Sequence, residues 1–224
     1  MGIALHKRKS SGSTLMTEGT IWKHILLFSI PLILGNMLQQ LYNTVDSIVV
    51  GNSLGSEALA AVGSSSSLIS LLISFSMGAA AGAGVIVSQF IGAQNKKGIH
   101  ESVHTALAIA LILGVVLTVL GITLSPQILR WMGTPDEVMP QSVIYLRLYF
   151  AGLLFSVLYN MASGILNAVG NSKRSLLYLA IASFTNIVLD LLFIPVLKMG
   201  IAGAAIATDI SQVLSAVLCM LYLM

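Results

Sequence analysis

Charged residues are scarce in this chain. Eleven of its 224 residues are Lys or Arg and eight are Asp or Glu, so that 8% carry a charge, whereas a soluble domain carries about 25%. Hydrophobic residues make up 56% of the chain, and its mean hydropathy is +0.93. So few charges cannot cover a surface that faces water, and the composition therefore predicts an integral membrane protein. The net charge of +3 is too dispersed to indicate a nucleic-acid partner.

Other absences narrow the function. Cys219 is the only cysteine, so the chain cannot form an internal disulfide. A GxxxxGKS or GxxxxGKT motif is missing, which excludes a P-loop ATPase on this chain. The tract MGAAAGAGVIVSQFIGAQ is typical of close helix packing in membranes instead. No nucleophile has an adjacent base, and no cluster of metal ligands is apparent. These absences argue against an enzyme and against any cofactor other than a coupling ion.

Six long apolar segments each have the length that a membrane-spanning helix needs, about 20 residues. They cover approximately residues 25–50, 59–91, 103–124, 140–169, 176–197 and 201–224. In lipid, a helix satisfies its backbone hydrogen bonds internally. The sequence therefore predicts an all-α polytopic membrane protein, with six transmembrane helices in residues 21–224. The segments at 59–91 and 140–169 are longer than one straight span requires, so we expect these helices to tilt or project.

Basic residues lie mainly on one side of the predicted spans. Eight of the eleven precede the first span or lie between the second and third or the fourth and fifth: Lys7, Arg8, Lys9, Lys23, Lys96, Lys97, Lys173 and Arg174. An excess of Lys and Arg marks the cytoplasmic side of a membrane. The distribution predicts a multi-pass protein of the cell membrane with a cytoplasmic N-terminus. Residues 1–20 are expected to form a cytoplasmic tail.

The last predicted span is still apolar at Met224, where the sequence ends. Either the chain ends at the membrane surface, or it is one half of a longer transporter. Many transporters consist of two similar halves with the substrate between them, and we find no convincing repeat within these residues. We therefore favour the second alternative, in which the partner half lies beyond Met224 or is a second chain.

Two acidic residues interrupt the apolar runs: Asp46 in YNTVDSIVV and Asp190 in NIVLDLLFIP. A carboxylate at the bilayer centre costs about 2.5–3.5 kcal/mol on insertion scales, and such residues usually bind or relay something. The helix rise of about 1.5 Å per residue places both acids in the outward-facing half of their helices. The same estimate puts Asn186, Thr208 and Tyr145 at a similar depth, and Asn186 shares a helix face with Asp190.

These five residues are expected to form a binding site for a coupling cation: Asp46, Asn186, Asp190, Thr208 and Tyr145. Carboxylate, amide and hydroxyl oxygens are hard ligands, and the first four residues can hold Na⁺. A proton is the other candidate, because burial favours the neutral form of an acid. The alternative is that the acids pair with Arg147 or with backbone groups and only hold helices together.

Other polar residues are expected to lie apart from this site. Asp209 lies about 100° around its helix from Thr208, so we expect it to face another helix or the missing half. His100 and His104 share a helix face at positions i and i+4, a spacing found in some zinc sites. No third ligand accompanies them in an HExxH order, and we interpret them as interfacial histidines.

The sequence resembles the opening of the multidrug and toxic compound extrusion (MATE) family. The similarity begins with MTEGTIWKHILLFSIPLILGNMLQQLYNTVDSIVVGNSLGSEALAAVG and continues in VSQFIGAQN, SGILNAVGNSK and NIVLDLLFIPVLKMGIAGAAIAT. It covers nearly all of residues 16–224. The resemblance implies the N-terminal lobe of a two-lobed, twelve-helix transporter with a V-shaped cleft. Such a transporter exports drugs and other organic cations in exchange for Na⁺ or H⁺ by alternating access.

The resemblance assigns the coupling site to the same five residues. Asp46 matches the family's first-helix acid, and Asn186 and Asp190 match its fifth-helix Asn-x-x-x-Asp motif. Thr208 and Tyr145 match a sixth-helix threonine and a fourth-helix tyrosine. In the family, these groups are tied to proton or Na⁺ coupling.

Two other functions remain open at this point. A lipid-linked sugar flippase of the same superfamily would want a more cationic cleft than the few intramembrane basic residues provide. A non-transporting scaffold or remnant would account for the abrupt end of the chain. The sequence departs from the family pattern at Asn167, where relatives often carry arginine, and in having no second lobe.

Overall fold

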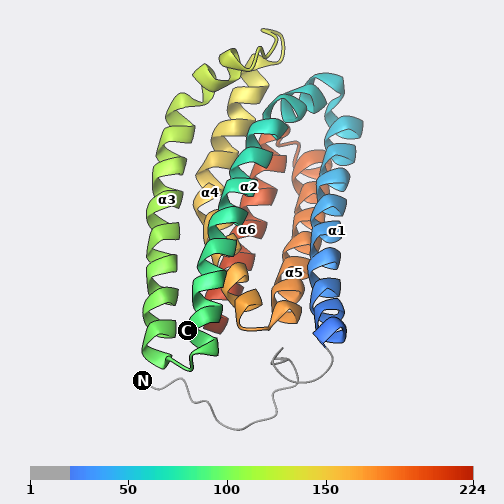
Figure 1. Cartoon of the computed structure of the whole chain (residues 1–224). Coiled ribbons are helices and arrows are strands. Elements are labelled where there is room, and N and C mark those ends of the chain that lie inside the picture. Colours follow the sequence, from blue (N-terminus) through green and yellow to red (C-terminus); the bar gives the residue numbers. More distant parts are fainter. Residues whose placement is uncertain (1–20, 224) are drawn as a thin grey trace.

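The structure is a computed structural model that describes residues 21–223, except for the side chains at positions 21, 24, 25 and 27. Six long helices make up this part of the chain. The helices are α1 (Ile21–Leu54), α2 (Ser56–Gly92), α3 (Lys96–Trp131), α4 (Met139–Ala168), α5 (Ser172–Leu191) and α6 (Ile201–Leu223), and a short π-helix, η1 (Leu192–Val196), extends α5. They run alongside one another as a bundle (Figure 1). The predicted cytoplasmic tail, residues 1–20, lies outside the described part of the chain.

All six predicted helices are present, which confirms the all-α fold. Five of them, α2 to α6, are long and apolar enough to cross a membrane by length and composition, with η1 counted as part of α5. α1 has 34 residues but is not among these five, so its crossing of the membrane stays a prediction. Several helices extend beyond the predicted spans, because apolar composition marks only the part in hydrocarbon and the helical backbone continues through the headgroup region.

α4 lies at the centre of the bundle. It packs against α2, α3 and α6, while α1 packs mainly against α5. In its apolar span 56% of the residues are buried, compared with 17% in α2 and in α3. α3 and α1 accordingly lie on opposite flanks (Figure 1), and the main hydrophobic core is built around Leu146, Leu153 and Ile165 of α4.

Glycines allow α4 to approach its neighbours closely. A Cβ atom on Gly164 would lie 2.9 Å from the carbonyl oxygen of Ala80, and one on Gly84 would lie 3.3 Å from the carbonyl oxygen of Gly164. A Cβ atom on Gly121 of α3 would overlap the ring of Phe150. Small residues at such crossings are typical of helix packing in lipid. The glycine- and alanine-rich part of α2 therefore serves as a packing face, as its composition predicts.

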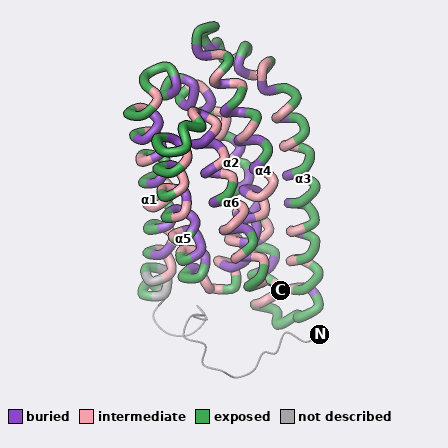
Figure 2. Tube along the Cα trace, turned by 180° about the vertical axis from the view of Figure 1, so that it is seen from behind, coloured by how far each residue is buried: buried purple, intermediate pink, exposed green. Residues whose placement is uncertain are grey.

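Apolar and polar residues are distributed in the reverse of the usual soluble pattern. Large hydrophobic side chains such as Leu71, Ile112 and Phe184 are exposed, whereas Asp46 and Asp190 are buried. Figure 2 shows the exposed residues along the outer sides of the helices, most continuously on α3, and the buried ones towards the interior. The outer surface suits a lipid environment, and the interior contains the polar groups from which a site can be built.

Candidate functional site

Asn186 and Asp190 lie one turn apart near the C-terminal end of α5. Their spacing puts them on one face of the helix, and their exposed fractions are 1% and 0%. The π-helix η1 follows immediately, and the Leu197 N–H donates to the Leu192 carbonyl across it at 2.9 Å. Pro195 lacks an N–H, and π-turns are frequent at functional sites. The predicted span over residues 176–197 thus corresponds to α5 together with η1.

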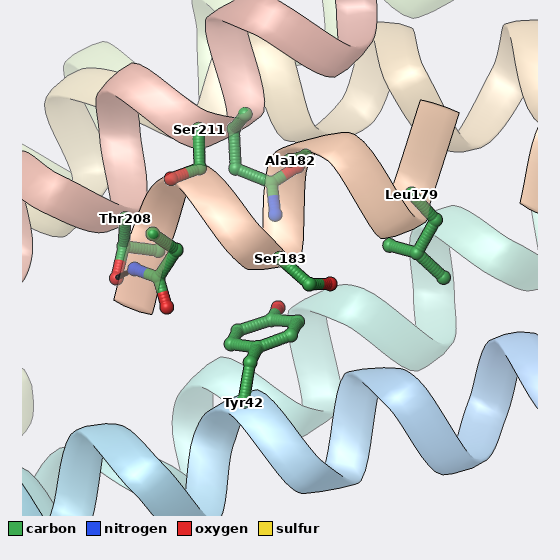
Figure 3. A pocket seen from close by; sticks show the side chains of 8 residues that line it. Tyr42, Leu179, Ala182, Ser183, Thr208 and Ser211 are labelled. Atoms are coloured by element: carbon green, nitrogen blue, oxygen red, sulfur yellow. Dashed lines mark hydrogen bonds between the residues drawn. The ribbon is translucent and has the colours of Figure 1, made fainter. Parts of the chain in front are cut away.

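The side chain of Asn186 reaches α6. Its Nδ2 atom donates to Thr208 Oγ1 at 3.5 Å, at the long limit of a hydrogen bond. Both residues line a small cavity of about 10 Å³ between α1, α5 and α6, close to the space that one water molecule needs. In Figure 3, Tyr42 of α1 points across this cavity towards Ser183 of α5. The cavity has room for a small cation or a water molecule and excludes larger ligands.

Asp46 of α1 and Tyr145 of α4 complete the predicted group, and both side chains are buried. Tyr145 packs in a core to which α1, α2, η1 and α6 contribute. Asp46 and Asp190 are near enough for their charges to interact, and the Tyr145 hydroxyl lies within electrostatic reach of both. The structure therefore brings the five predicted residues into one buried region. These five residues are all described, and the bond between Asn186 and Thr208 is the only side-chain hydrogen bond among them.

Several buried oxygens in this region lack a hydrogen-bond donor within the described part of the chain. They are Asp46 Oδ1, Asn186 Oδ1 and both carboxylate oxygens of Asp190. A buried polar group without a partner costs about 1–3 kcal/mol, and a charged one costs more. A small cation or a proton would relieve this cost, because every one of these atoms can accept a hydrogen bond or coordinate a cation.

Asp46 and Asp190 form no ion pair with any basic residue that the structure describes. Within residues 21–223, the one ion pair joins Lys97 to Glu101 at 3.7 Å, and Arg147 is exposed. The alternative in which Arg147 neutralises Asp46 or Asp190 is therefore wrong for this structure. Within the described part of the chain, neither carboxylate has a basic partner.

Asp209 lies on a different side of α6 from Thr208, as its position in the helix predicts. A Cβ atom on Gly152 of α4 would overlap the Asp209 carboxylate, so Gly152 leaves the space that this side chain occupies. The Tyr149 hydroxyl lies within reach of the Asp209 charge. Asp209 thus faces α4 and is separate from the small cavity that Thr208 lines.

Sequence reasoning missed four polar residues that line the small cavity, and two of them follow the helical spacing of predicted residues. Tyr42 precedes Asp46 by four positions, and Gln212 follows Thr208 by four positions. Residues at this spacing are neighbours on a helix surface. The helical period of the predicted residues was therefore the signal that could have identified them.

A larger groove between α1, α2 and α4 was also missed. Its volume is about 380 Å³, and small or apolar residues of α2 and Phe28 of α1 form much of its lining. Asn160, Ser163 and Asn167 of α4 supply polar groups, and they share one helix face at spacings of three and four. Asn167 Oδ1 is buried without a donor among the described residues. The sequence had indicated Asn167 only as a departure from the family pattern.

Residues 31–192 match the family model described as MatE. The chain belongs to the MatE family. It is 38% identical over 196 residues to the probable multidrug resistance protein YpnP of Bacillus subtilis (strain 168), covering 88% of this chain and 44% of that protein. It is 23% identical over 207 residues to the multidrug export protein MepA of Staphylococcus aureus (strain MRSA252), covering 92% of this chain and 46% of MepA.

Solved structures of MatE proteins have the same fold. A crystal structure of MATE in the bent conformation superposes with a TM-score of 0.86 at 35% identity, over 92% of this chain and 46% of that one. An outward-facing multidrug resistance MATE family transporter of the MOP superfamily superposes with a TM-score of 0.85 at 34% identity, over 90% and 44% of the two chains. The present chain thus spans about half the length of the relatives it matches. MatE proteins are transporters rather than enzymes, and the apolar helices of this one make it a multi-pass membrane protein.

Proposed function

We propose that residues 21–224 form one lobe of a cation-coupled antiporter that exports drugs or other organic cations by alternating access. Membership of the MatE family and the names of its multidrug-resistance relatives support this function. The observation that carries it is the set of buried oxygens without donors on Asp46, Asn186 and Asp190. An unpaired carboxylate in an apolar bundle is tolerated where it takes up and releases a positive ion.

The coupling ion occupies the buried region at the ends of α1 and α5. Asp46, Asn186, Asp190 and Thr208 supply carboxylate, amide and hydroxyl oxygens, the ligand types that Na⁺ shares with other hard cations. Alternatively, a proton binds a carboxylate there, with the Tyr145 hydroxyl in the same electrostatic neighbourhood. The small cavity beside Asn186 and Thr208 admits an ion or a water molecule and no drug, so ion and substrate bind at different places in the lobe.

The substrate binds in the larger groove between α1, α2 and α4. Its volume of about 380 Å³ falls within the range of about 300–1,000 Å³ that is usual for small-molecule sites. The wall is mostly apolar, and the free Asn167 carbonyl oxygen can accept a hydrogen bond from a substrate N–H. The lining residues that the structure describes include no Lys or Arg. This disfavours the flippase alternative, because an anionic lipid-linked sugar calls for basic side chains.

A partner completes the cleft. The relatives are about twice as long as this chain, and transporters of this kind move two halves relative to each other around a shared site. The partner is a second lobe or a second copy of this chain. The distribution of Lys and Arg supports a location in the cell membrane, with the N-terminus, including residues 1–20, in the cytoplasm.

Transport in everted membrane vesicles tests the proposal. With an imposed Na⁺ or H⁺ gradient, vesicles that contain the wild-type protein are expected to accumulate a fluorescent organic cation. Asp190→Asn is expected to reduce the gradient-dependent accumulation to background. Asp136→Asn is the matched control, because Asp136 is exposed in the connection between α3 and α4. Equal accumulation by wild type and Asp190→Asn, at equal amounts in the membrane, would overturn the site. If accumulation by the wild-type protein did not depend on the gradient, the scaffold alternative would be favoured.

A further inference from the structure

Two histidines lie in contact near the start of α3, and neither of them lines the larger groove or the small cavity. His100 and His104 are both exposed, and their Nε2 atoms lie 2.9 Å apart. The ring centroids are 4.1 Å apart, with the planes inclined at 57°. The two Nε2 atoms are therefore in direct contact, and the proposed transport function makes no use of them.

The position along α3 places the pair near the membrane surface. α3 has 36 residues, so its length is about 54 Å at a rise of about 1.5 Å per residue, compared with about 30 Å for the hydrocarbon core. The helix must therefore extend into the headgroup or aqueous region. His100 and His104 lie in its first turns, next to the charged residues Lys97 and Glu101, which makes them accessible to ions in solution.

The distance between the two Nε2 atoms is compatible with a hydrogen bond and also with two ligands of one metal ion. In the metal-free chain, one neutral ring donates its Nε2–H to the Nε2 lone pair of the other. When both rings carry their hydrogen on Nδ1, each ring has an Nε2 lone pair available for a metal ion. Metal–imidazole bonds are about 2.0–2.1 Å long, so two ligands at 90° lie about 2.9 Å apart, whereas a tetrahedral angle requires about 3.3 Å. The observed distance matches adjacent ligands of a square-planar or octahedral ion.

We propose that His100 and His104 form a bidentate surface site for a divalent transition-metal ion of the Cu²⁺ or Ni²⁺ type, with water in the remaining positions. The described residues contain no group of three or more His, Cys, Asp or Glu side chains that could hold a metal, so the site is a two-histidine chelate and not a closed structural site. Imidazole is a preferred ligand of these ions, and they favour square-planar or tetragonal geometry.

The neighbouring charges modulate this site. Lys97 Nζ lies 3.7 Å from Glu101 Oε1 one turn along the same end of α3. The carboxylate partly offsets the repulsion that the lysine exerts on a bound cation, although exposed pairs of this kind are weak.

Cu²⁺ alone is the probe for the test. The full chain, purified without a polyhistidine tag, is titrated with CuSO₄ and followed by isothermal titration calorimetry and electron paramagnetic resonance. We expect one Cu²⁺ per chain, with a spectrum that shows two equivalent nitrogen ligands. The matched variant exchanges neighbouring residues, His104→Thr with Thr105→His, which keeps the composition. It moves the second imidazole by about 100° around the helix, so that it lies about 140° from His100.

The exchange variant is expected to bind Cu²⁺ about tenfold more weakly or worse, because the second ligand no longer acts at high effective concentration. His100→Gln, which keeps His104, should show the same loss. His6 and His24 are present in every variant, so the differences report the α3 pair alone. Equal affinity and equal spectra for wild type and both variants would overturn the proposal, and helix content measured by circular dichroism shows that the variants are folded.

Discussion

The amide of Asn186 on α5 donates to the hydroxyl of Thr208 on α6 at 3.5 Å. This contact joins two helices at the wall of the small cavity, while the Asn186 carbonyl oxygen stays without a donor among the described residues. One side chain thus fixes α5 to α6 and also presents a free acceptor beside Asp190. The arrangement has the form expected of a cation site whose occupant comes from outside the chain.

Thr208→Val should weaken ion coupling, whereas Thr208→Ser should largely preserve it. Valine has the shape of threonine but no oxygen, so the Asn186 amide loses its acceptor and the cavity loses one ligand. Loss of one such interaction costs about 1 kcal/mol or more, which corresponds to about a fivefold higher half-saturating ion concentration. The half-saturating ion concentration is obtained by measuring the transport rate as a function of Na⁺ concentration or pH. Equal half-saturation for the valine and serine variants would exclude Thr208 as a ligand.

Asp46→Asn and Asp190→Asn should not act independently. The two carboxylates interact electrostatically, and residues that bind one ion as a unit give non-additive effects. The double variant is therefore expected to lose no more gradient-driven transport than the more severe single variant. The measurement is a double-mutant cycle on initial transport rates. Losses that multiply would instead indicate two separate sites.

Na⁺ binding should also appear as thermal stabilisation. A ligand that binds only the folded state stabilises it by about 2.7 kcal/mol at a concentration 100 times its Kd. If Na⁺ binds the buried site, the Tm of the wild-type protein in detergent should be higher in Na⁺ than in choline. Asp190→Asn should abolish that difference. Choline controls for ionic strength because it is too large for a cavity of about 10 Å³. A wild-type Tm that does not respond to Na⁺ would favour the proton as coupling ion.

The helices and the polar layer were predictable because both depend on local sequence. Apolar runs define the helices, and a rise of about 1.5 Å per residue is enough to place Asp46, Asn186 and Asp190 at one depth. The groove on the α4 face of Asn160 and Asn167 and the contact between Asp209 and α4 were not predictable in the same way. They depend on which helix packs against which, and helical period gives a face of one helix but not the identity of its neighbour.

Gly164→Ala should destabilise the crossing of α2 and α4. The new Cβ atom would lie 2.9 Å from the backbone carbonyl oxygen of Ala80, and a backbone atom cannot move aside as a flexible side chain does. Overpacking of this kind costs about 1–3 kcal/mol, which thermal unfolding in detergent would report as a lower Tm. Gly82→Ala on α2 is the control, since its Cβ atom would meet nothing within 4 Å. If both variants unfolded at the same temperature, the close approach would not be needed for stability.

Gly152→Ala should be destabilising in a way that Asp209→Ala relieves. A Cβ atom at position 152 would overlap the Asp209 carboxylate, so the single glycine variant forces α4 and α6 apart or displaces the acid, at about 1–3 kcal/mol. Removing the carboxylate restores the space, and the double variant should be more stable than Gly152→Ala alone. The measurement is a thermal double-mutant cycle in detergent, with Gly78→Ala as a control whose Cβ atom would meet nothing within 4 Å. A double variant no more stable than Gly152→Ala would show that the glycine is required for a neighbour other than Asp209.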